Sequence, residues 1–369
     1  MIPLFEHYRL LTHKLPYVSL GEFPTTIQKL DEIGRHIGSE SLFIKRDDLS
    51  GKVYGGNKIR KLEFILGDAL HINVNEVLTF GAAGSNHALA TAIYAKQLGL
   101  NSISMLVPQP NAYYVRRNLL MSYHCDAELH LYPNIPYIMP LATLAVYYQL
   151  LRHRLKSGQL PKVIPMGGSS PLGAVGFVNA AFELKEQIIK GEIPEPDYIY
   201  VASGSMGTAA GLTLGLEVIK SKTRVISVRV NSDKIVNTTG MVKLIKKTNT
   251  LLSSLDSSFP RLKFSEYDID IRNGFFGKQY ALFSKEGMEA VDCMERYGRI
   301  KLEGTYTGKA FAALIDDGKK SSLKNKVILF WNTYNSIDFS EVIATIDYRQ
   351  LPRCFHRYFE EGVQPLERE

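Results

Sequence analysis

The stretch YIYVASGSMGTAAGL, residues 198–212, decides the expected fold. Its first six residues are mostly aromatic or β-branched, which is typical of a strand. A loop of glycine, serine and other small residues follows, and a helix-forming segment comes next. A strand that enters a helix through such a loop is typical of α/β proteins with parallel sheets.

The loop within this stretch is a candidate phosphate-binding site. Main-chain N–H groups at the start of the helix, together with the loop hydroxyls, can surround an anion. A tight turn between two buried elements is the alternative. The candidate residues are Ser203, Gly204, Ser205, Met206, Gly207 and Thr208.

The same loop departs from the common nucleotide and esterase motifs. No Gly-Lys-Ser/Thr follows it, and its glycines are not spaced as GxGxxG. The esterase motif GxSxG also fails, because Ser203 stands at the first glycine position. A nicotinamide-dependent dehydrogenase stays an alternative, and it predicts nucleotide binding without a visible chromophore.

Strand-like segments fall into two sets along the chain. The first set comprises residues 76–80, 102–107, 127–132 and 162–166. The second set is more apolar and comprises residues 198–203, 224–230 and 326–331. Apolar runs of this kind suit strands that are covered on both faces. A stretch rich in Gly, Ser and Pro separates the sets, so we expect an α/β protein with two mostly parallel sheets flanked by helices.

Composition and charge narrow the class of protein. The chain has 369 residues, of which 45% are hydrophobic, and a net charge of +7. These values are compatible with one large or two smaller globular domains. The basic residues form no stripe interleaved with aromatic residues, so we expect no nucleic-acid partner. The three cysteines lack CxxC spacing, which argues against a metal site or a disulfide scaffold and favours the cytoplasm.

The longest apolar stretch runs from Ile135 to Leu151. It is short for a membrane span and contains Pro140, so we expect a buried helix there and no membrane association. We also expect no signal peptide, because the first ten residues lack a continuous apolar run.

A second candidate segment is GGNKIRKLEF, residues 55–64. Asn57 is placed to cap a helix, which puts Lys58 in the first helical turn. The positive end of the helix dipole and the charges of Arg60 and Lys61 should lower the pKa of Lys58, and a neutral amine can attack a carbonyl carbon. The two preceding glycines should let a bulky group approach the backbone. An exposed lysine at a helix start is the alternative.

A third candidate segment is TFGAAGSNHALATAIYAKQLGL, residues 79–100. A strand runs into a loop of small residues, and Ser85 is placed to cap the helix that follows. The N–H groups at this helix start, with the side chains of Ser85, Asn86 and His87, could bind a carboxylate. An ordinary capped helix with a hydrogen-bonded His87 is the alternative.

Together, the three segments offer a reactive lysine, a carboxylate site and a phosphate site. Pyridoxal 5'-phosphate joins a lysine through its aldehyde and needs a site for its phosphate, and an amino-acid substrate needs a carboxylate site. The sequence therefore predicts this cofactor and a small amino acid as substrate.

Four segments are similar to motifs of one family: FIKRDDLSGKVYGGNKIRKLEF, GSNHALATA, ASGSMGTAAGL and EGTYTGKAFAAL. From about residue 20 to about residue 335, the chain resembles 1-aminocyclopropane-1-carboxylate deaminase and D-cysteine desulfhydrase. The resemblance implies the tryptophan-synthase-β-like fold, which is fold type II of the pyridoxal-phosphate enzymes. It also implies a homodimer, a large cofactor-binding domain (1–60 plus 170–369), a small domain (61–169), and an active site in the cleft between them.

The resemblance assigns roles to individual residues. Lys58 matches the Schiff-base lysine of the family. Ser85 matches the serine beside the substrate, and Asn86 matches the asparagine that contacts the phenolic oxygen of the cofactor. Tyr280 and Tyr306 match two active-site tyrosines of the family.

Thr307 indicates the branch of the family, because it matches the residue near the ring nitrogen of the cofactor. Deaminases of the family carry a glutamate there, and a hydroxyl cannot hold that nitrogen protonated as a carboxylate can. Such a ring suits the loss of a good leaving group better than the opening of a strained carbon ring. The GGSS sequence at residues 167–170 also resembles the desulfhydrase version.

The chain departs from the family pattern at four places. The family glutamine before Ser-Asn is Gly84 here, His-Thr-Gly-Gly is NTYN at residues 332–335, and Asp-Pro-Val is EGT at residues 303–305. The tail from about residue 336 has no counterpart.

We expect a β-elimination like that of D-cysteine desulfhydrase, with a 2-oxo acid, ammonia and sulfide as products. The alternatives are a ring-opening deaminase that yields 2-oxobutanoate, another ammonia-lyase or racemase, and a non-catalytic pyridoxal-phosphate-binding protein.

Overall fold

The chain divides into two compact units. The computed structural model describes residues 1–132, 139–320 and 323–367. Unit 1 comprises Met1–Phe64 and Ser169–Ile337, and unit 2 comprises Ile65–Gly168 and Asp338–Glu369. The tail (Asp338–Glu369) thus belongs to unit 2, whereas the large domain that the resemblance implies would include it.

Unit 1 is built on a six-stranded sheet with the strand order β1-β2-β10-β7-β8-β9. All neighbouring strands are parallel except β1 and β2. The strands are β1 (Ile27–Lys29), β2 (Ser41–Lys45), β7 (Tyr198–Ser203), β8 (Arg224–Arg229), β9 (Asp270–Arg272) and β10 (Val327–Trp331). The helices are α1 (Pro3–His7), α2 (Leu11–Lys14), α3 (Asp31–Ile37), the start of α4 (Lys58–His71), α8 (Pro171–Ile189), α9 (Gly207–Val218), α10 (Thr238–Leu255), α11 (Lys285–Cys293) and α12 (Thr307–Lys319).

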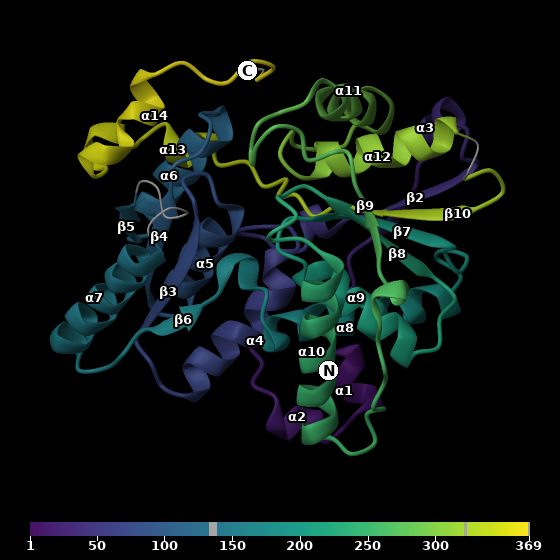
Figure 1. Ribbon diagram of the computed structural model, residues 1–369, viewed down its shortest axis with the longest axis horizontal. Coiled ribbons are helices and arrows are strands. Elements are labelled where there is room, and N and C mark those ends of the chain that lie inside the picture. The colour runs from purple at the N-terminus through teal and green to yellow at the C-terminus, as the bar shows by residue number, and fades with distance from the viewer. Residues whose placement is uncertain (133–138, 321–322, 368–369) are drawn as a thin grey trace. The chain divides into compact units, whose positions relative to one another are not determined.

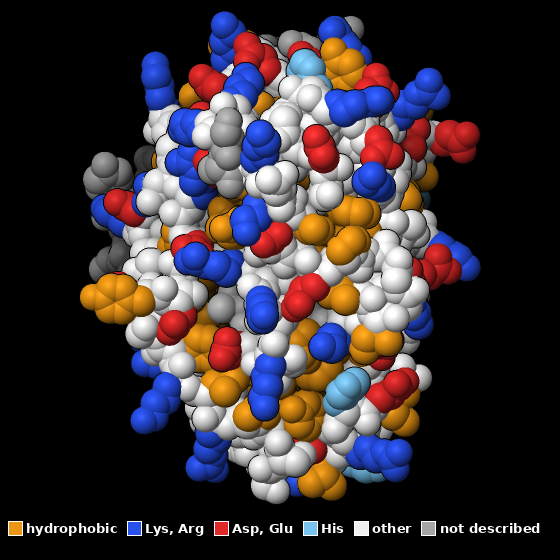
Figure 2. All heavy atoms as spheres, turned by 90° about the vertical axis from the view of Figure 1, so that its right-hand side faces the viewer, with side chains coloured by type: hydrophobic (Ala, Val, Ile, Leu, Met, Phe, Trp, Pro, Cys, Tyr) orange, Lys and Arg blue, Asp and Glu red, His pale blue; other side chains and the backbone are white. Residues whose placement is uncertain are grey.

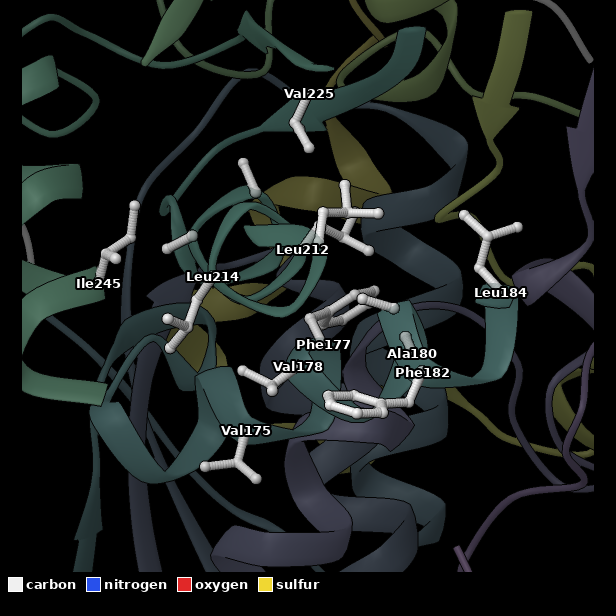
Figure 3. Close-up of a cluster of buried hydrophobic side chains, with 14 of the residues drawn as sticks. Val175, Phe177, Val178, Ala180, Phe182, Leu184, Leu212, Leu214, Val225 and Ile245 are labelled. Carbon is white, nitrogen blue, oxygen red and sulfur yellow. The ribbon is translucent and has the colours of Figure 1, made fainter. Parts of the chain in front are cut away.

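The apolar strand β10 explains why helices cover both faces of this sheet (Figure 1). Leu329 and Trp331 pack in a core cluster with α8, α9 and α10, whereas Ile328 and Phe330 pack in a second cluster with α3, α11 and α12. Consecutive strand residues point to opposite faces, so a strand without polar residues must be covered twice. Figure 3 shows part of the first cluster, in which Phe177 of α8 is fully buried.

Unit 2 is built on a four-stranded, all-parallel sheet with the order β5-β4-β3-β6. The strands are β3 (Glu76–Ala82), β4 (Asn101–Val107), β5 (Glu128–Leu131) and β6 (Lys162–Ile164). The helices are α5 (Asn86–Gln97), α6 (Tyr113–His124), α7 (Met139–Ser157), α13 (Ser340–Ile343) and α14 (Arg357–Glu360). Leu78 and Ile103 of the sheet pack with Val146 and Leu150 of α7 in a small core.

The apolar stretch predicted to be a buried helix forms α7, but the prediction of burial is wrong. A helix that lies on one sheet face buries only one stripe of its surface. Four of its apolar side chains are more than half exposed: Leu144, Tyr147, Tyr148 and Leu151. Residues 135–138 of the stretch lie outside the described residues. Within residues 1–132, 139–320 and 323–367, no helix combines the length and apolar character that crossing a membrane requires.

Each of the seven predicted strand segments contains an observed strand, and the two predicted sets form the two sheets. The α/β class with mostly parallel sheets is therefore confirmed. Strands β1, β2 and β9 were not predicted from the sequence, and β1 and β9 have only three residues each. On the face drawn in Figure 2, basic side chains are interspersed with acidic ones.

Candidate active site

Lys58 begins α4 and lies beside the predicted phosphate loop. Its Nζ donates a hydrogen bond to Asn57 Oδ1 at 2.8 Å, and Asn57 Nδ2 donates to Thr208 Oγ1 at 2.9 Å. Asn57 and Thr208 are 151 positions apart in the sequence. Asn57 therefore connects the candidate lysine to the candidate phosphate loop.

The two glycines before Lys58 pack against the main chain of the protein itself. A β-carbon at Gly55 would lie 2.1 Å from the main-chain oxygen of Asp48, and one at Gly56 would lie 2.6 Å from that of Tyr334. Gly56 also has a φ of +91°, which disfavours residues with a side chain. On the side where a side chain would stand, neighbouring backbone therefore takes the space at both glycines.

The NTYN segment closes over this loop. Asn335 Oδ1 accepts the N–H of Gly55 at 2.6 Å, and the main-chain oxygen of Thr333 accepts the N–H of Asn57 at 3.3 Å. These bonds fix the main chain directly before the lysine. The departure from the family sequence at residues 332–335 therefore has a structural role at the start of α4.

Burial makes the Lys58 amine a weaker base. It lowers the pKa of Lys58 to about 8, against the opposing effect of the Glu303 carboxylate. Burial, reinforced by the charge of Lys58, also lowers the pKa of Lys61 well below its usual value. An amine with a pKa near 8 is neutral in about a tenth of molecules at pH 7. The direction of the Lys58 shift agrees with the prediction, but burial is its main cause.

Arg60 contributes little charge beside Lys58, because two buried carboxylates neutralise it. Its guanidinium lies 2.7 Å from Asp47 and 2.7 Å from Glu183, and Lys45 Nζ lies 2.6 Å from Glu183. All four side chains are at most 2% exposed. Burial alone would raise the Glu183 pKa, but Arg60 and Lys45 hold it at about 2. This cluster of two positive and two negative charges anchors the first turn of α4.

The predicted phosphate loop connects β7 to α9. Met206 has a φ of +67°, a left-handed conformation that is rare for residues with a side chain and is often found at functional sites. Gly207 has no room for a side chain, since a β-carbon would lie 2.6 Å from Ser169 Oγ and 3.0 Å from Lys61 Nζ. Ser169 Oγ donates to Ser205 Oγ at 2.9 Å and accepts the N–H of Gly207 at 3.1 Å. A lysine amine and two hydroxyls therefore surround this compact loop.

Tyr280 and Tyr306 lie together at the same loop. Their hydroxyls are hydrogen-bonded to each other, and their rings meet edge to face with centroids 6.1 Å apart. The Tyr306 ring would lie 2.9 Å from a β-carbon at Gly204. Lys309 Nζ donates at 2.7 Å to each of two main-chain oxygens that flank Tyr280 in sequence. Burial raises the pKa of Tyr280 to about 12, so this hydroxyl keeps its proton at neutral pH.

Thr307 begins α12, and Glu303 caps that helix. The Glu303 carboxylate accepts the main-chain N–H groups of Thr305, Tyr306 and Thr307 at 2.7 to 2.8 Å. Thr307 Oγ1 accepts the N–H of Glu303 at 3.0 Å and lies 3.3 Å from its carboxylate. A carboxylate at a helix N-terminus is favourable, so the EGT departure builds a helix cap.

In unit 2, Ser85 caps α5, as the sequence predicts. Its Oγ accepts the N–H of Ala88 at 3.2 Å. Asn86 Oδ1 accepts a hydrogen bond from Asn118 Nδ2 at 2.9 Å, and His87 is buried in the first turn. The N–H groups at the start of this helix suit an anion.

The predicted site residues therefore form one group in each unit. Unit 1 brings together Lys58, the loop from Ser203 to Thr208, Tyr280, Tyr306 and Thr307. Unit 2 brings together Ser85, Asn86 and His87. Lys61 was not predicted as a neighbour of the phosphate loop, although it lies one helical turn after Lys58 and shares its side of the helix. Ser169 carries no signal in the sequence, because it lies 36 positions from its partner Ser205.

The stretch that contains the candidate lysine, the predicted phosphate loop and the tyrosine pair matches a known family. Residues 18–333 match the family described as pyridoxal-phosphate dependent enzymes. The chain belongs to this family. It has the type II fold of these enzymes, and pyridoxal 5'-phosphate is the cofactor that the family uses.

Relatives from two branches of the family are similar to the chain. A putative 1-aminocyclopropane-1-carboxylate deaminase of Pyrococcus horikoshii is 35% identical over 86% of this chain and 91% of the relative. A D-cysteine desulfhydrase of Serratia proteamaculans is 33% identical over 82% of this chain and 88% of the relative. The crystal structure of a homologue of the deaminase superposes with a TM-score of 0.74 and 32% identity, over 91% of this chain and 98% of that one. The resemblance predicted from the sequence is therefore confirmed.

The residues of unit 1 fit pyridoxal phosphate. Within the part of the chain that the structure describes, Ser203 Oγ and Asn332 Nδ2 are buried without a hydrogen-bond partner. They lie at the carboxyl ends of the paired strands β7 and β10, the edge where α/β sheets bind ligands. Buried polar atoms usually have partners, so these two atoms indicate a ligand-binding place. Lys58 offers the amine for the aldehyde, and Lys61 offers a second amine that can donate hydrogen bonds to the phosphate.

Proposed function

We propose that this chain catalyses β-elimination from a small amino acid such as D-cysteine. With D-cysteine and one water molecule, the products are pyruvate, ammonia and hydrogen sulfide. The observation that carries the proposal is the hydroxyl of Thr307 at the start of α12, where the resemblance puts the partner of the ring nitrogen. Glu303, the nearest carboxylate in the sequence, already accepts three main-chain hydrogen bonds. A hydroxyl there favours substrates with a good leaving group over ring opening.

Lys58 has two tasks in this proposal. Pyridoxal phosphate, when bound, supplies an electron sink that makes the α-hydrogen of an amino acid acidic. Lys58 carries the cofactor and then, as a free amine, removes the α-proton as a general base. Its pKa of about 8 supports this role, because the neutral amine is accessible near physiological pH.

Other residues bind and orient the two ligands. The N–H groups of the loop from Ser203 to Thr208, with Lys61, hold the phosphate. Ser85 and His87, with the N–H groups at the start of α5, bind the substrate carboxylate. The Asn86 amide contacts the phenolic oxygen of the cofactor. The structure supports these assignments through the hydroxyls, the lysine amine and the helix start described above.

The tyrosine pair acts on the leaving group. The two hydroxyls share a hydrogen bond. One of them can donate a proton to the departing sulfur, while the other stabilises the oxygen that has lost its proton. The raised pKa of Tyr280, about 12, keeps that proton available at neutral pH. With D-cysteine, the sulfur then leaves as hydrogen sulfide.

Product analysis of the purified, cofactor-loaded protein tests the proposal. The substrates are D-cysteine, β-chloro-D-alanine, D-serine and 1-aminocyclopropane-1-carboxylate. We expect pyruvate and sulfide in equal amounts from D-cysteine. Release of 2-oxobutanoate from the cyclopropane amino acid with a higher kcat/KM would overturn the proposal. Absence of product from all four would favour a non-catalytic binding protein.

A pair of variants isolates the role of residue 307. Thr307→Glu should lower turnover of D-cysteine and raise ring opening, because a carboxylate keeps the ring nitrogen protonated. Thr307→Ser retains the hydroxyl and serves as the matched control. Equal product ratios in both variants would show that this position does not select the reaction.

We also propose that the protein is a homodimer and acts in the cytoplasm. The resemblance supports the dimer, and the three free cysteines fit a reducing compartment. Light scattering at several protein concentrations tests the dimer, with twice the mass of one chain as the expected result.

A further inference from the structure

The tail of unit 2 reaches the predicted substrate loop through one glutamine. Tyr358 of α14 is buried, and its hydroxyl accepts the main-chain N–H of Gln109 at 3.2 Å. The side-chain oxygen of Gln109 accepts the N–H of Gly84 at 2.9 Å. Two hydrogen bonds and one residue thus connect the tail to the position directly before Ser85.

The tail is fastened to this part of unit 2 through its main chain. Arg116 Nε of α6 donates to the Tyr358 oxygen at 2.7 Å, and Asn111 Nδ2 donates to the same oxygen at 2.9 Å. Arg116 also donates to the Glu361 oxygen at 2.9 Å. Because these bonds use main-chain oxygens of the tail, they fix its backbone and thereby hold the Tyr358 hydroxyl at Gln109.

Helix α6 also holds the substrate loop directly. Asn118 Nδ2 donates to the Gly84 oxygen and to Asn86 Oδ1, both at 2.9 Å. Gln109 is oriented in turn, since its Nε2 donates to the Tyr114 hydroxyl at 2.6 Å. Both main-chain polar groups of Gly84 are therefore bound by side chains from outside the loop.

Packing explains why this position is glycine. A β-carbon at Gly84 would lie 2.7 Å from the Tyr114 ring and 2.8 Å from Val115. The glutamine that the resemblance expects at residue 84 does not fit in this space. The amide nitrogen of Gln109 would lie only 3.1 Å from that β-carbon. The carboxamide beside residue 84 therefore comes from Gln109 and not from residue 84 itself.

We propose that Gln109, anchored by Tyr358 of the tail, is a positioning residue that sets the shape of residues 84–87 and thereby the affinity for the substrate carboxylate. The proposal rests on the proposed function, in which Ser85 and its neighbours bind that carboxylate. Gln109 acts on the loop main chain and not on the substrate itself. The tail, which lacks a counterpart in the resemblance, is then part of substrate binding in this chain.

Two variants of the full-length, cofactor-loaded protein test the proposal. Tyr358→Phe removes only the hydroxyl that accepts the Gln109 N–H, and Gln109→Met removes the acceptor for Gly84 while keeping a similar length. The matched control is Tyr348→Phe, because the exposed hydroxyl of Tyr348, also in the tail, donates a long hydrogen bond of 3.5 Å to Glu360. The measurements are KM and kcat for D-cysteine, and hydrogen–deuterium exchange of residues 84–88.

In both variants we expect faster exchange at residues 84–88 and a KM raised about two- to tenfold, with kcat changed less than twofold, as for the loss of one hydrogen bond. Tyr348→Phe should match the wild type. Wild-type exchange at residues 84–88 in both variants would overturn the proposal. Faster exchange with an unchanged KM would instead overturn the carboxylate assignment on which the proposal rests. Exchange at residues 203–208 reports separately on the cofactor site.

Discussion

The phosphate loop of unit 1 and the 84–87 loop of unit 2 follow the same plan, a strand that enters a helix through small residues, but different kinds of residues hold them. Gly207 of the first loop lies against Lys61, a residue proposed to bind the ligand itself. Gly84 of the second loop is held by Gln109, a residue proposed to act only through the loop. The same local pattern can thus form part of a reactive centre or a recognition element whose shape is set from a distance.

This difference predicts two kinds of defect. Changes at the lysine and the phosphate loop should impair cofactor binding and all activity. Changes around residue 84 should alter the affinity for the substrate while the cofactor stays bound. The largest effects should therefore come from unit 1.

Replacing Lys58 should have the largest effect. Lys58→Ala should lower turnover by a factor of about 10² to 10⁴ or more, since it removes the proposed general base and the point of covalent attachment. Borohydride treatment followed by mass spectrometry measures the attachment, and product assay measures turnover. Lys52→Ala is the matched control, because Lys52 belongs to the same segment and its side chain is 81% exposed. Covalent cofactor on the Lys58→Ala protein would place the reactive centre on another residue and contradict the roles given to the two loops.

Filling the phosphate loop should have the next largest effect. Gly207→Ala should raise the cofactor Kd about ten- to hundredfold, because the added methyl group meets Ser169 Oγ and Lys61 Nζ. Fluorescence titration of the cofactor-free protein measures this Kd. Gly362→Ala is the control, since among the described residues, its two chain neighbours aside, no atom lies within 4 Å of its β-carbon position. An unchanged cofactor Kd combined with a raised substrate KM would reverse the roles assigned to the two loops.

The pH dependence of cofactor uptake should show the smallest of the expected effects. Uptake by the cofactor-free protein should accelerate as pH rises through about 8, because only the neutral Lys58 amine reacts. Glu303→Gln should move the midpoint to lower pH, because the Glu303 charge opposes the lowering of the Lys58 pKa. Stopped-flow absorbance between pH 6.5 and 9.5 measures both proteins. A midpoint that stays or rises in the variant would contradict the electrostatic account.

The same shift has a consequence for stability without cofactor. Burial lowers the folded-state pKa of Lys58 to about 8, whereas the unfolded chain keeps a value near 10.5. Between these values the unfolded chain binds more protons, so the contribution of Lys58 makes the folded protein more stable as pH rises.

The sequence predicted most of the fold because the long strands are apolar and the loops between strand and helix are rich in small residues. It did not reveal β2, whose last residue, Lys45, is charged and yet buried against Glu183. It misjudged α7, because an apolar composition does not tell which side of a helix meets a partner. Long apolar runs thus predict elements better than they predict burial.

The candidate site was predictable where its residues stand close together in the sequence. Lys58, the phosphate loop and the Ser85 cap each stand in a segment that carries its own signal. Contacts that join distant segments carry no such signal. The bond from Gln109 to Gly84 spans 25 positions and the one from Tyr358 to Gln109 spans 249, so only the structure could connect them.

The cluster of buried charges below Lys58 has a consequence for how the sequence can change. Lys45, Asp47, Arg60 and Glu183 balance one another, and their side chains are almost fully buried. Loss of any one leaves an unpaired charge, which costs about 3–5 kcal/mol, whereas exchange of a matched pair for apolar residues can be neutral. These four positions should therefore be inherited as a set: relatives that have lost Arg60 should also have lost one of its acidic partners.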